Sequence, residues 1–176
     1  MRPSRPAAWP PPSPSCAVKS VAAGHDLVIL TVDAASPDAQ RLLDELSDVL
    51  LRMNGDSGRA SFDVEAATPR GGFYLARDDA GNLLSCAALR PLGEPDSSIG
   101  ELKRMYARPG STGVGAALLA HVEAQARRHG YQALHLSTRV VNSRAVAFYA
   151  RHGYAPVIAW GKYVGAAQST CLGKTF

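Results

Sequence analysis

A glycine-rich turn that feeds directly into a helical pattern constrains this chain more than any other feature. Gly110, Gly113 and Gly115 follow Pro109, and the apolar spacing beyond them predicts a helix closed by Gly130 as its C-cap. The first amides of a helix have no partner within it and lie at the positive end of its dipole. Glycine, which has no Cβ, lets an anion approach such amides closely. The turn therefore predicts an anion site.

The predicted helix has an apolar side and a polar side, as expected when one face packs on a core. The apolar side carries Val114, Leu118, Leu119 and Val122, and the polar side carries His121, Glu123, Gln125, Arg127 and Arg128.

Several anions, and a purely structural role, are consistent with such a turn. Gly-x-Gly before a helix is often only a tight connection. The turn contains no lysine, which argues against a nucleoside triphosphatase of the Walker type. A dinucleotide-binding turn needs a third glycine where Leu118 stands, and an acidic residue where the next strand ends in Ser137, Thr138 and Arg139. An anion bound here is therefore expected to be neither ATP nor NAD.

A second motif follows a short strand predicted at Ala133–Leu136. It is the run VNSRAVAFYARHGY from Val141 to Tyr154, and the stretch ELKRMYARP from Glu101 to Pro109 precedes the glycine turn. Together they resemble the GNAT family of acetyl-CoA-dependent N-acetyltransferases, whose second motif is Asn-x-x-Ala-x-x-x-Tyr-x-x-x-Gly-[Phe/Tyr]. The matching residues are Asn142, Ala145, Tyr149, Gly153 and Tyr154. The resemblance extends from Asp26 to the C-terminus.

The resemblance implies a mixed, mostly antiparallel sheet of about six to seven strands with helices on both faces, α/β or α+β in class. In this family the strand before the turn pairs incompletely with the next strand, and the pantetheine arm of acetyl-CoA enters the gap. The implied cofactor-binding residues are Met105, Tyr106 and Ala107 on the strand, the amides of Gly113, Val114, Gly115 and Ala116, and Asn142 and Tyr149.

The chain departs from the family pattern at Gly110, which stands where relatives have arginine or glutamine, and its loop from Pro109 to Gly113 is shorter. The pyrophosphate would then rest on backbone amides alone. A catalytically weak acyl-CoA-binding module of the same fold is therefore an alternative of a different class. An NADP-dependent reductase with Arg139 on the ribose phosphate is a further alternative, which the single glycine turn disfavours.

Acetyl transfer to an amine needs a deprotonated amine and a proton for the departing thiolate. By the resemblance, Tyr149 is the candidate proton donor, and its phenol, with a pKa near 10, suits a thiolate with a pKa of about 8.5. A core aromatic is the alternative for Tyr149, and a helix cap is the alternative for Asn142. Glu101 is the candidate general base, with a surface carboxylate as its alternative. Ser137 stands where many relatives carry glutamate.

Composition suits one globular domain, because the chain has 176 residues, of which 46% are hydrophobic, and no apolar run reaches membrane-spanning length. Cys16, Cys86 and Cys171 lie far apart without metal-ligand spacing. We therefore expect no metal site and a reducing, cytoplasmic compartment.

The net charge of +4 conceals an uneven distribution. Residues 26–101 hold 6 basic and 14 acidic side chains, whereas residues 102–176 hold 10 basic side chains and only one acid, Glu123. A basic half suits a phosphate-bearing cofactor and an acidic half could suit a cationic amine, although two solvated faces would look the same. The scattered basic residues argue against nucleic acid. Acetyl-CoA and an amine acceptor are the expected partners, without a membrane, and a homodimer is compatible with the sequence.

Residues 1–25 contain six prolines and no periodic apolar pattern, so we expect a disordered tail there and the N-acetyltransferase domain over residues 26–176. Ser36 and Pro37 should begin a helix with an apolar stripe, and a further short helix is predicted at Phe62–Ala67. The stripe comprises Leu42, Leu46, Val49, Leu50 and Met53. Further strands are expected at Leu27–Val32, Phe73–Arg77, Leu83–Leu89, Ile99–Ala107, after Tyr154 through Ile158, and at Gln168–Lys174.

The sequence alone generates one test. Acetyl-CoA should raise the melting temperature and NADPH should not, because a ligand that binds only the native state stabilises it by about 2.7 kcal/mol at a hundredfold excess over Kd. Differential scanning fluorimetry with each nucleotide separates the two. A melting temperature that stays unchanged at millimolar acetyl-CoA would contradict the anion-site interpretation.

Overall fold

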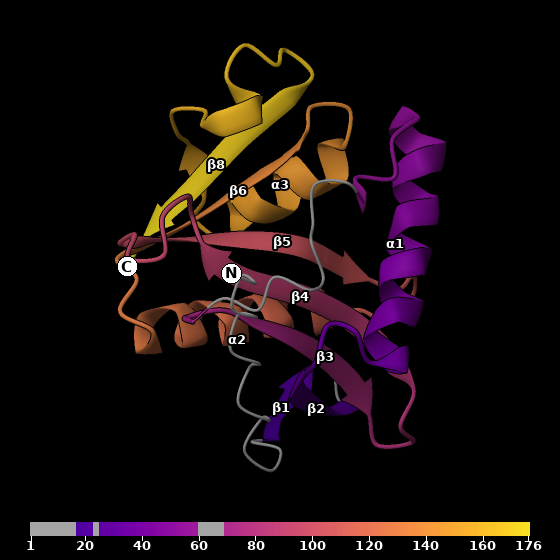
Figure 1. The fold of residues 1–176 in the computed structure, drawn as a ribbon. Helices are drawn as coiled ribbons and strands as arrows, with labels where there is room; N and C mark the ends of the chain where they lie inside the picture. Colours follow the sequence, from indigo (N-terminus) through magenta and orange to yellow (C-terminus); the bar gives the residue numbers. More distant parts are fainter. Residues whose placement is uncertain (1–16, 23–24, 60–68) are drawn as a thin grey trace, which may run out of the picture.

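The computed structural model describes residues 17–22, 25–59 and 69–176, and it places one eight-stranded sheet at the centre of the chain (Figure 1). The strand order across the sheet is β1-β2-β3-β4-β5-β6-β8-β7. The strands are β1 (Val18–Ala22), β2 (His25–Val32), β3 (Gly72–Asp78), β4 (Leu83–Pro91), β5 (Ile99–Ala107), β6 (Ala133–Arg139), β7 (Ala155–Pro156) and β8 (Ser169–Thr175).

Every neighbouring pair in the sheet is antiparallel except β5 and β6, which are parallel. The predicted mixed, mostly antiparallel sheet is therefore confirmed, with one strand more than the upper number expected. β7 is shorter than predicted, because Ile158 lies outside it and is 92% exposed.

Helices cover both faces of the sheet. α1 (Pro37–Asn54) packs on one face with a cluster that includes Leu42, Leu75 and Cys86. α2 (Val114–Arg128) and α3 (Ser143–Arg151) lie on the other face, where the larger cluster includes Leu118, Leu134 and Tyr149. The two clusters identify which side chains of the central strands β3 and β4 face α1 and which face α2.

α1 begins and ends as the sequence predicts. The Ser36 hydroxyl accepts a hydrogen bond from the Ala39 amide, and Gly55 ends the helix with a φ of 73°. The predicted apolar stripe is buried only in its first half, at Leu42 and Leu46, whereas Met53 is 40% exposed. Leu50 and Asn54, in the second half of the helix, line a pocket and not a filled core.

The polar side predicted for α2 is wrong at Glu123, which is only 8% exposed. Its carboxylate accepts hydrogen bonds from the Tyr154 hydroxyl at 3.1 Å and from Lys174 Nζ at 2.9 Å. A buried carboxylate needs such partners, and here they come from the segment after α3 and from β8. This ion pair joins α2 to the last strand of the fold.

The boundary predicted for the N-terminal tail is also wrong. Val18–Ala22 forms β1, which pairs along its whole length with β2 and also contacts α2. A five-residue strand on a sheet edge is stabilised by backbone pairing. Such a strand can therefore form without an alternating apolar pattern. Residues 1–16 and 23–24 of the predicted tail, and the helix predicted at Phe62–Ala67, lie outside the described residues.

Truncation tests the role of β1. Removal of residues 1–22 should lower the melting temperature by several degrees relative to removal of residues 1–16, because the pairing with β2 is lost. Each backbone hydrogen bond contributes roughly 0.5–1.5 kcal/mol net, and each kcal/mol is about 2–4 °C in a chain of this size. Equal melting temperatures for the two truncated proteins would contradict the placement of β1.

Candidate active site

The site begins where β5 and β6 separate. These strands pair only between Ile99–Glu101 and Ala133–His135, although β5 continues to Ala107 and β6 to Arg139. Beyond that point β6 remains paired with β8, and β5 remains paired with β4. A wedge therefore opens between two strands in the middle of the sheet, as the family resemblance implies.

A β-bulge marks the start of the wedge. The register between β4 and β5 shifts between Cys86 and Ala88, and Arg104 on β5 has a φ of 54°. A bulge places one extra residue on a strand, bends the strand and re-aims its backbone groups. This one lies just beyond Glu101, the last residue of β5 that pairs with β6.

Backbone contacts indicate which β5 groups face the wedge. The Tyr106 carbonyl accepts a hydrogen bond from Ser85 Oγ at 2.6 Å, and the Arg108 amide donates to the Leu84 carbonyl at 2.8 Å, both toward β4. Successive residues of a strand direct their backbone groups to opposite edges. Met105 and Ala107 therefore face the wedge.

Tyr106 is turned away from the wedge, contrary to its predicted place among the cofactor-binding residues. Its backbone faces β4, and its hydroxyl lies 3.4 Å from Glu45 Oε2 on α1. The alternation of strand residues explains the difference, because neighbours of two wedge-facing residues must face the other edge.

The glycine turn lies at the open end of this strand edge. Gly113 has a φ of 80° and caps α2 without a side-chain hydrogen bond. Within the described chain, no backbone hydrogen bond is made by the amides of Gly113, Gly115 or Ala116, and the Val114 amide reaches the Ser111 carbonyl only at 3.4 Å. A Cβ on Gly115 would lie 3.6 Å from Ala107 Cβ. The unpaired amides therefore continue the wedge-facing edge of β5 and suit an anion.

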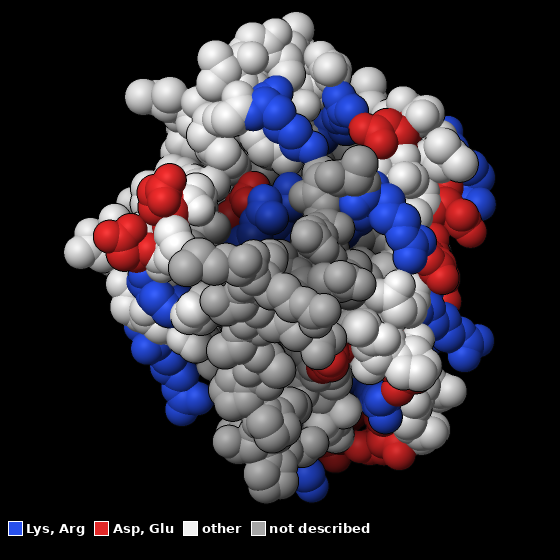
Figure 2. Space-filling view, viewed as in Figure 1, with Lys and Arg blue, Asp and Glu red and all other residues white. Residues whose placement is uncertain are grey.

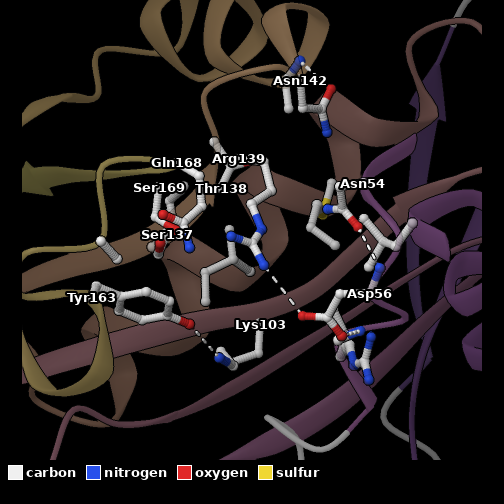
Figure 3. Close-up of a pocket in the computed structure, with 18 of the residues that line it drawn as sticks. Asn54, Asp56, Lys103, Ser137, Thr138, Arg139, Asn142, Tyr163, Gln168 and Ser169 are labelled. Atoms are coloured by element: carbon white, nitrogen blue, oxygen red, sulfur yellow. Dashed lines mark hydrogen bonds and ion pairs between the residues drawn. The ribbon is translucent and has the colours of Figure 1, made fainter. Parts of the chain in front are cut away.

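A pocket of about 380 Å³ lies at the other end of the wedge (Figure 3). α1 and the loop after it contribute Leu46, Leu50, Asn54, Asp56 and Gly58; β5 contributes Leu102, Lys103, Arg104 and Met105; and β6 contributes Leu136, Ser137, Thr138 and Arg139. α3 and its cap contribute Asn142, Ala145 and Tyr149, and the segment before β8, with the first residue of β8, contributes Lys162, Tyr163, Ala166, Gln168 and Ser169.

Tyr149 and Asn142 reach this pocket from the α2 face. Tyr149 is 7% exposed, and burial raises the pKa of its phenol, so the hydroxyl carries its proton at neutral pH. Its hydroxyl makes no hydrogen bond to any described residue. The Asn142 side-chain oxygen caps α3 by accepting from the Ala145 amide at 3.2 Å, which confirms the capping interpretation and leaves its amide nitrogen for a ligand.

Glu101 is neither a surface carboxylate nor part of the pocket wall. It is 2% exposed and accepts a hydrogen bond from Arg90 Nε at 2.7 Å. Its other oxygen lies 3.6 Å from Lys103 Nζ, which donates to the Tyr163 hydroxyl at 3.1 Å. Burial lowers the pKa of Lys103 and raises the pKa of Tyr163. Glu101 is therefore connected to the pocket wall through its contact with Lys103.

Positive side chains dominate the described pocket wall. Lys103, Arg104, Arg139 and Lys162 line it, against one acid, Asp56. In Figure 2 the Lys and Arg side chains gather in the upper middle of the same face. The expectation that an acidic half serves a cationic amine therefore finds no support in this wall. The sequence did not indicate that Lys103 and Arg139 belong to one site, because they lie on different strands, on opposite sides of the wedge.

The described part of the chain contains no helix long and apolar enough to cross a membrane. It also contains no cluster of His, Cys, Asp and Glu side chains that could hold a metal ion.

The comparisons with known proteins agree with this geometry. The Acetyltransferase (GNAT) family model matches residues 39–154. An uncharacterized N-acetyltransferase of Schizosaccharomyces pombe is 32% identical over 117 residues, which are 65% of this chain and 71% of that protein. An IAA acetyltransferase of Azospirillum brasilense is 30% identical over 126 residues, or 70% of this chain and 80% of that protein.

Solved structures share the fold. A Klebsiella pneumoniae protein, provisionally assigned as an acyl-CoA N-acyltransferase, aligns with a TM-score of 0.71 and 25% identity over 85% of this chain and 97% of that one. A GNAT acetyltransferase from Elizabethkingia anophelis with acetyl-CoA bound aligns with a TM-score of 0.63 and 17% identity over 85% and 98% of the two chains. The family match over residues 39–154 and the two sequence relatives show that this chain belongs to the GNAT family of acetyltransferases.

Proposed function

We propose that the protein transfers an acetyl group from acetyl-CoA to a primary amine of a small molecule or peptide. The observation that carries this proposal is the wedge, whose unpaired β5 edge leads from the pocket to the unpaired amides at the start of α2. A linear substrate with hydrogen-bonding groups along its arm and a pyrophosphate at one end matches both features.

Binding of acetyl-CoA would use backbone groups almost entirely. Met105 and Ala107 would bond the pantetheine arm as a missing strand would. The amides of Gly113, Gly115 and Ala116, together with Val114, would hold the pyrophosphate at the positive end of the α2 dipole. Gly110 has no side chain to add, so the turn would bind the pyrophosphate through backbone amides alone.

The transfer forms one bond and breaks one. A neutral amine attacks the thioester carbon, the new C–N bond forms, and the C–S bond breaks to release the coenzyme A thiolate. The amine nitrogen gives up one proton and the thiolate takes one, so the step balances without a further reactant. The enzyme therefore needs a proton donor beside the sulfur and a proton acceptor beside the amine.

Tyr149 is the proposed donor to the thiolate. Its buried, protonated phenol has no competing hydrogen bond to a described residue and lies on the α2 face, where the arm would enter. Glu101 is the proposed proton acceptor, and it would receive the proton indirectly, through other side chains. Its contact with Lys103, and that of Lys103 with Tyr163, would connect it to the pocket.

A catalytically weak acyl-CoA-binding module is the second candidate, favoured by the bare turn at Gly110. Release of free thiol distinguishes the two candidates, because an acetyltransferase releases coenzyme A only when an amine acceptor is present. Binding of acetyl-CoA without thiol release across a broad amine panel would favour the module.

Substitution of Gly113 tests the anion site. Gly113→Asp should abolish the melting shift caused by acetyl-CoA, because a carboxylate would occupy the place of the pyrophosphate at the helix N-terminus. Gly81→Asp is the matched control, since Gly81 has a φ of 82°, close to the 80° of Gly113, but lies in the β3–β4 hairpin. If both variants bind acetyl-CoA as the parent does, the turn is only structural.

Two tyrosine variants separate catalysis from stability. Tyr149→Phe should lower kcat by about 10²–10⁴-fold when chemistry limits turnover, while the melting temperature and the acetyl-CoA affinity change little. Tyr154→Phe should do the reverse, because it removes the hydrogen bond to Glu123 but no group of the pocket wall. Single-turnover kinetics and thermal melts of both variants provide the comparison. An unchanged single-turnover rate in Tyr149→Phe would make Tyr149 a core aromatic and nothing more.

A further inference from the structure

The two faces of the wedge differ in chemistry. Ala88 belongs to the cluster under α1 and pairs directly with Lys103, so Lys103 projects on the α1 face. Leu136 belongs to the cluster under α2, so its neighbour Ser137 and, two residues further, Arg139 project on the α1 face as well. Tyr149 lies on the opposite face. If the thioester arm enters beside Tyr149, the acceptor approaches from the α1 face.

The α1 face of the wedge is cationic in its described part. Lys103, Arg104, Arg139 and Lys162 line the pocket with Asp56 as the single acid, and Glu101 lies behind Lys103. A cationic acceptor would be repelled by this wall, whereas an anionic group would be attracted.

Arg139 is the cation best placed to exchange partners. Its guanidinium lies 3.2 Å from Asp56 Oδ2 and reaches across the pocket (Figure 3). The Asp56 side chain is 58% exposed, and an exposed ion pair of this kind contributes little to stability. A ligand carboxylate can therefore replace Asp56 on Arg139, with a bidentate geometry that guanidinium favours.

Ser137 provides a second, independent indication of a polar ligand. Ser137 is one of the residues that line the pocket, and its hydroxyl is buried without a hydrogen-bond partner among the described residues. Buried hydroxyls in proteins are nearly always bonded. A polar group of a bound acceptor would satisfy it, and it lies on the same strand face as Arg139.

We propose that the acceptor is a primary amine that also carries a carboxylate, and that Arg139 binds this carboxylate on the α1 face of the wedge. This inference rests on the proposed acetyl transfer and specifies its substrate class. The cationic wall has a second effect, because neighbouring positive charge disfavours the ammonium form of the acceptor and favours the neutral amine that attacks the thioester.

Matched acceptors test the proposal. Free thiol release from acetyl-CoA is measured with amino acids, with the carboxamides of the same amino acids, and with aliphatic diamines. The carboxylates should have kcat/KM values about 10- to 100-fold above those of their carboxamides, as expected for hydrogen bonds to a charged group. Diamines should be the poorest acceptors. This order opposes intrinsic reactivity, because an amino acid amide has more neutral amine at neutral pH.

Substitutions at Arg139 locate the carboxylate site. Arg139→Gln should raise KM for the carboxylate acceptors about 10-fold or more, leave kcat nearly unchanged and remove the preference over carboxamides. Arg139→Lys should restore part of the preference. Arg128→Gln, which removes the same charge from the exposed end of α2, should have no effect. Thermal melts identify any variant that fails to fold, and in that case Lys162→Gln, at an exposed pocket residue, gives the same comparison.

The outcomes distinguish a failure of the carboxylate-binding proposal from a failure of the proposed acetyl transfer. Thiol release that is equally fast with carboxamides, or fastest with diamines, would overturn the anionic acceptor and leave acetyl transfer intact. A carboxylate preference that survives Arg139→Gln and Lys162→Gln would overturn the assignment to this wall. No thiol release with any amine would instead contradict the proposed acetyl transfer itself.

Discussion

The unpaired inner edge of β5 is the constraint on which the rest of the structure depends. A strand in the middle of a sheet normally has both edges bonded, yet among the described residues β5 has no strand neighbour on its β6 side beyond Glu101. Backbone groups without partners are costly unless water or a ligand satisfies them. The bulge at Arg104, the strong pairing of β6 with β8 and the start of α2 all maintain this gap. The fold therefore carries a preformed place for an extended ligand.

The wedge joins two faces with different chemistry, and this separation organises the site. On the α2 face, the helix dipole, the unpaired amides and the protonated Tyr149 suit a phosphate-bearing thioester. On the α1 face, Lys103 and Arg139 surround the space from which an acceptor would come. Glu101 lies between strands, buried and held by Arg90. In the proposed mechanism, catalysis would use groups on both faces of the sheet rather than one surface cleft.

Much of this could be predicted from local sequence, because the decisive signals are local. The glycine turn before Val114 and the cap at Asn142 each depend on a few adjacent residues, and the strand Ile99–Ala107 has the predicted bounds. Features that depend on pairing between distant segments could not be predicted. Glu123 is buried because Lys174 lies opposite it, and the bulge at Arg104 is defined only by the pairing of β5 with β4. The cationic wall required knowledge that Lys103 and Arg139 flank one gap.

The central claim is that the wedge-facing edge of β5 receives the arm of coenzyme A, and residue-resolved amide hydrogen exchange tests it most directly. Addition of acetyl-CoA should slow exchange at Met105 or Ala107 and at Gly113, Gly115 and Ala116. The Arg108 amide, which already donates to Leu84, should change far less and serves as the internal reference. Protection that appears at Arg108 as strongly as at the wedge-facing amides, or only outside this region, would contradict the account.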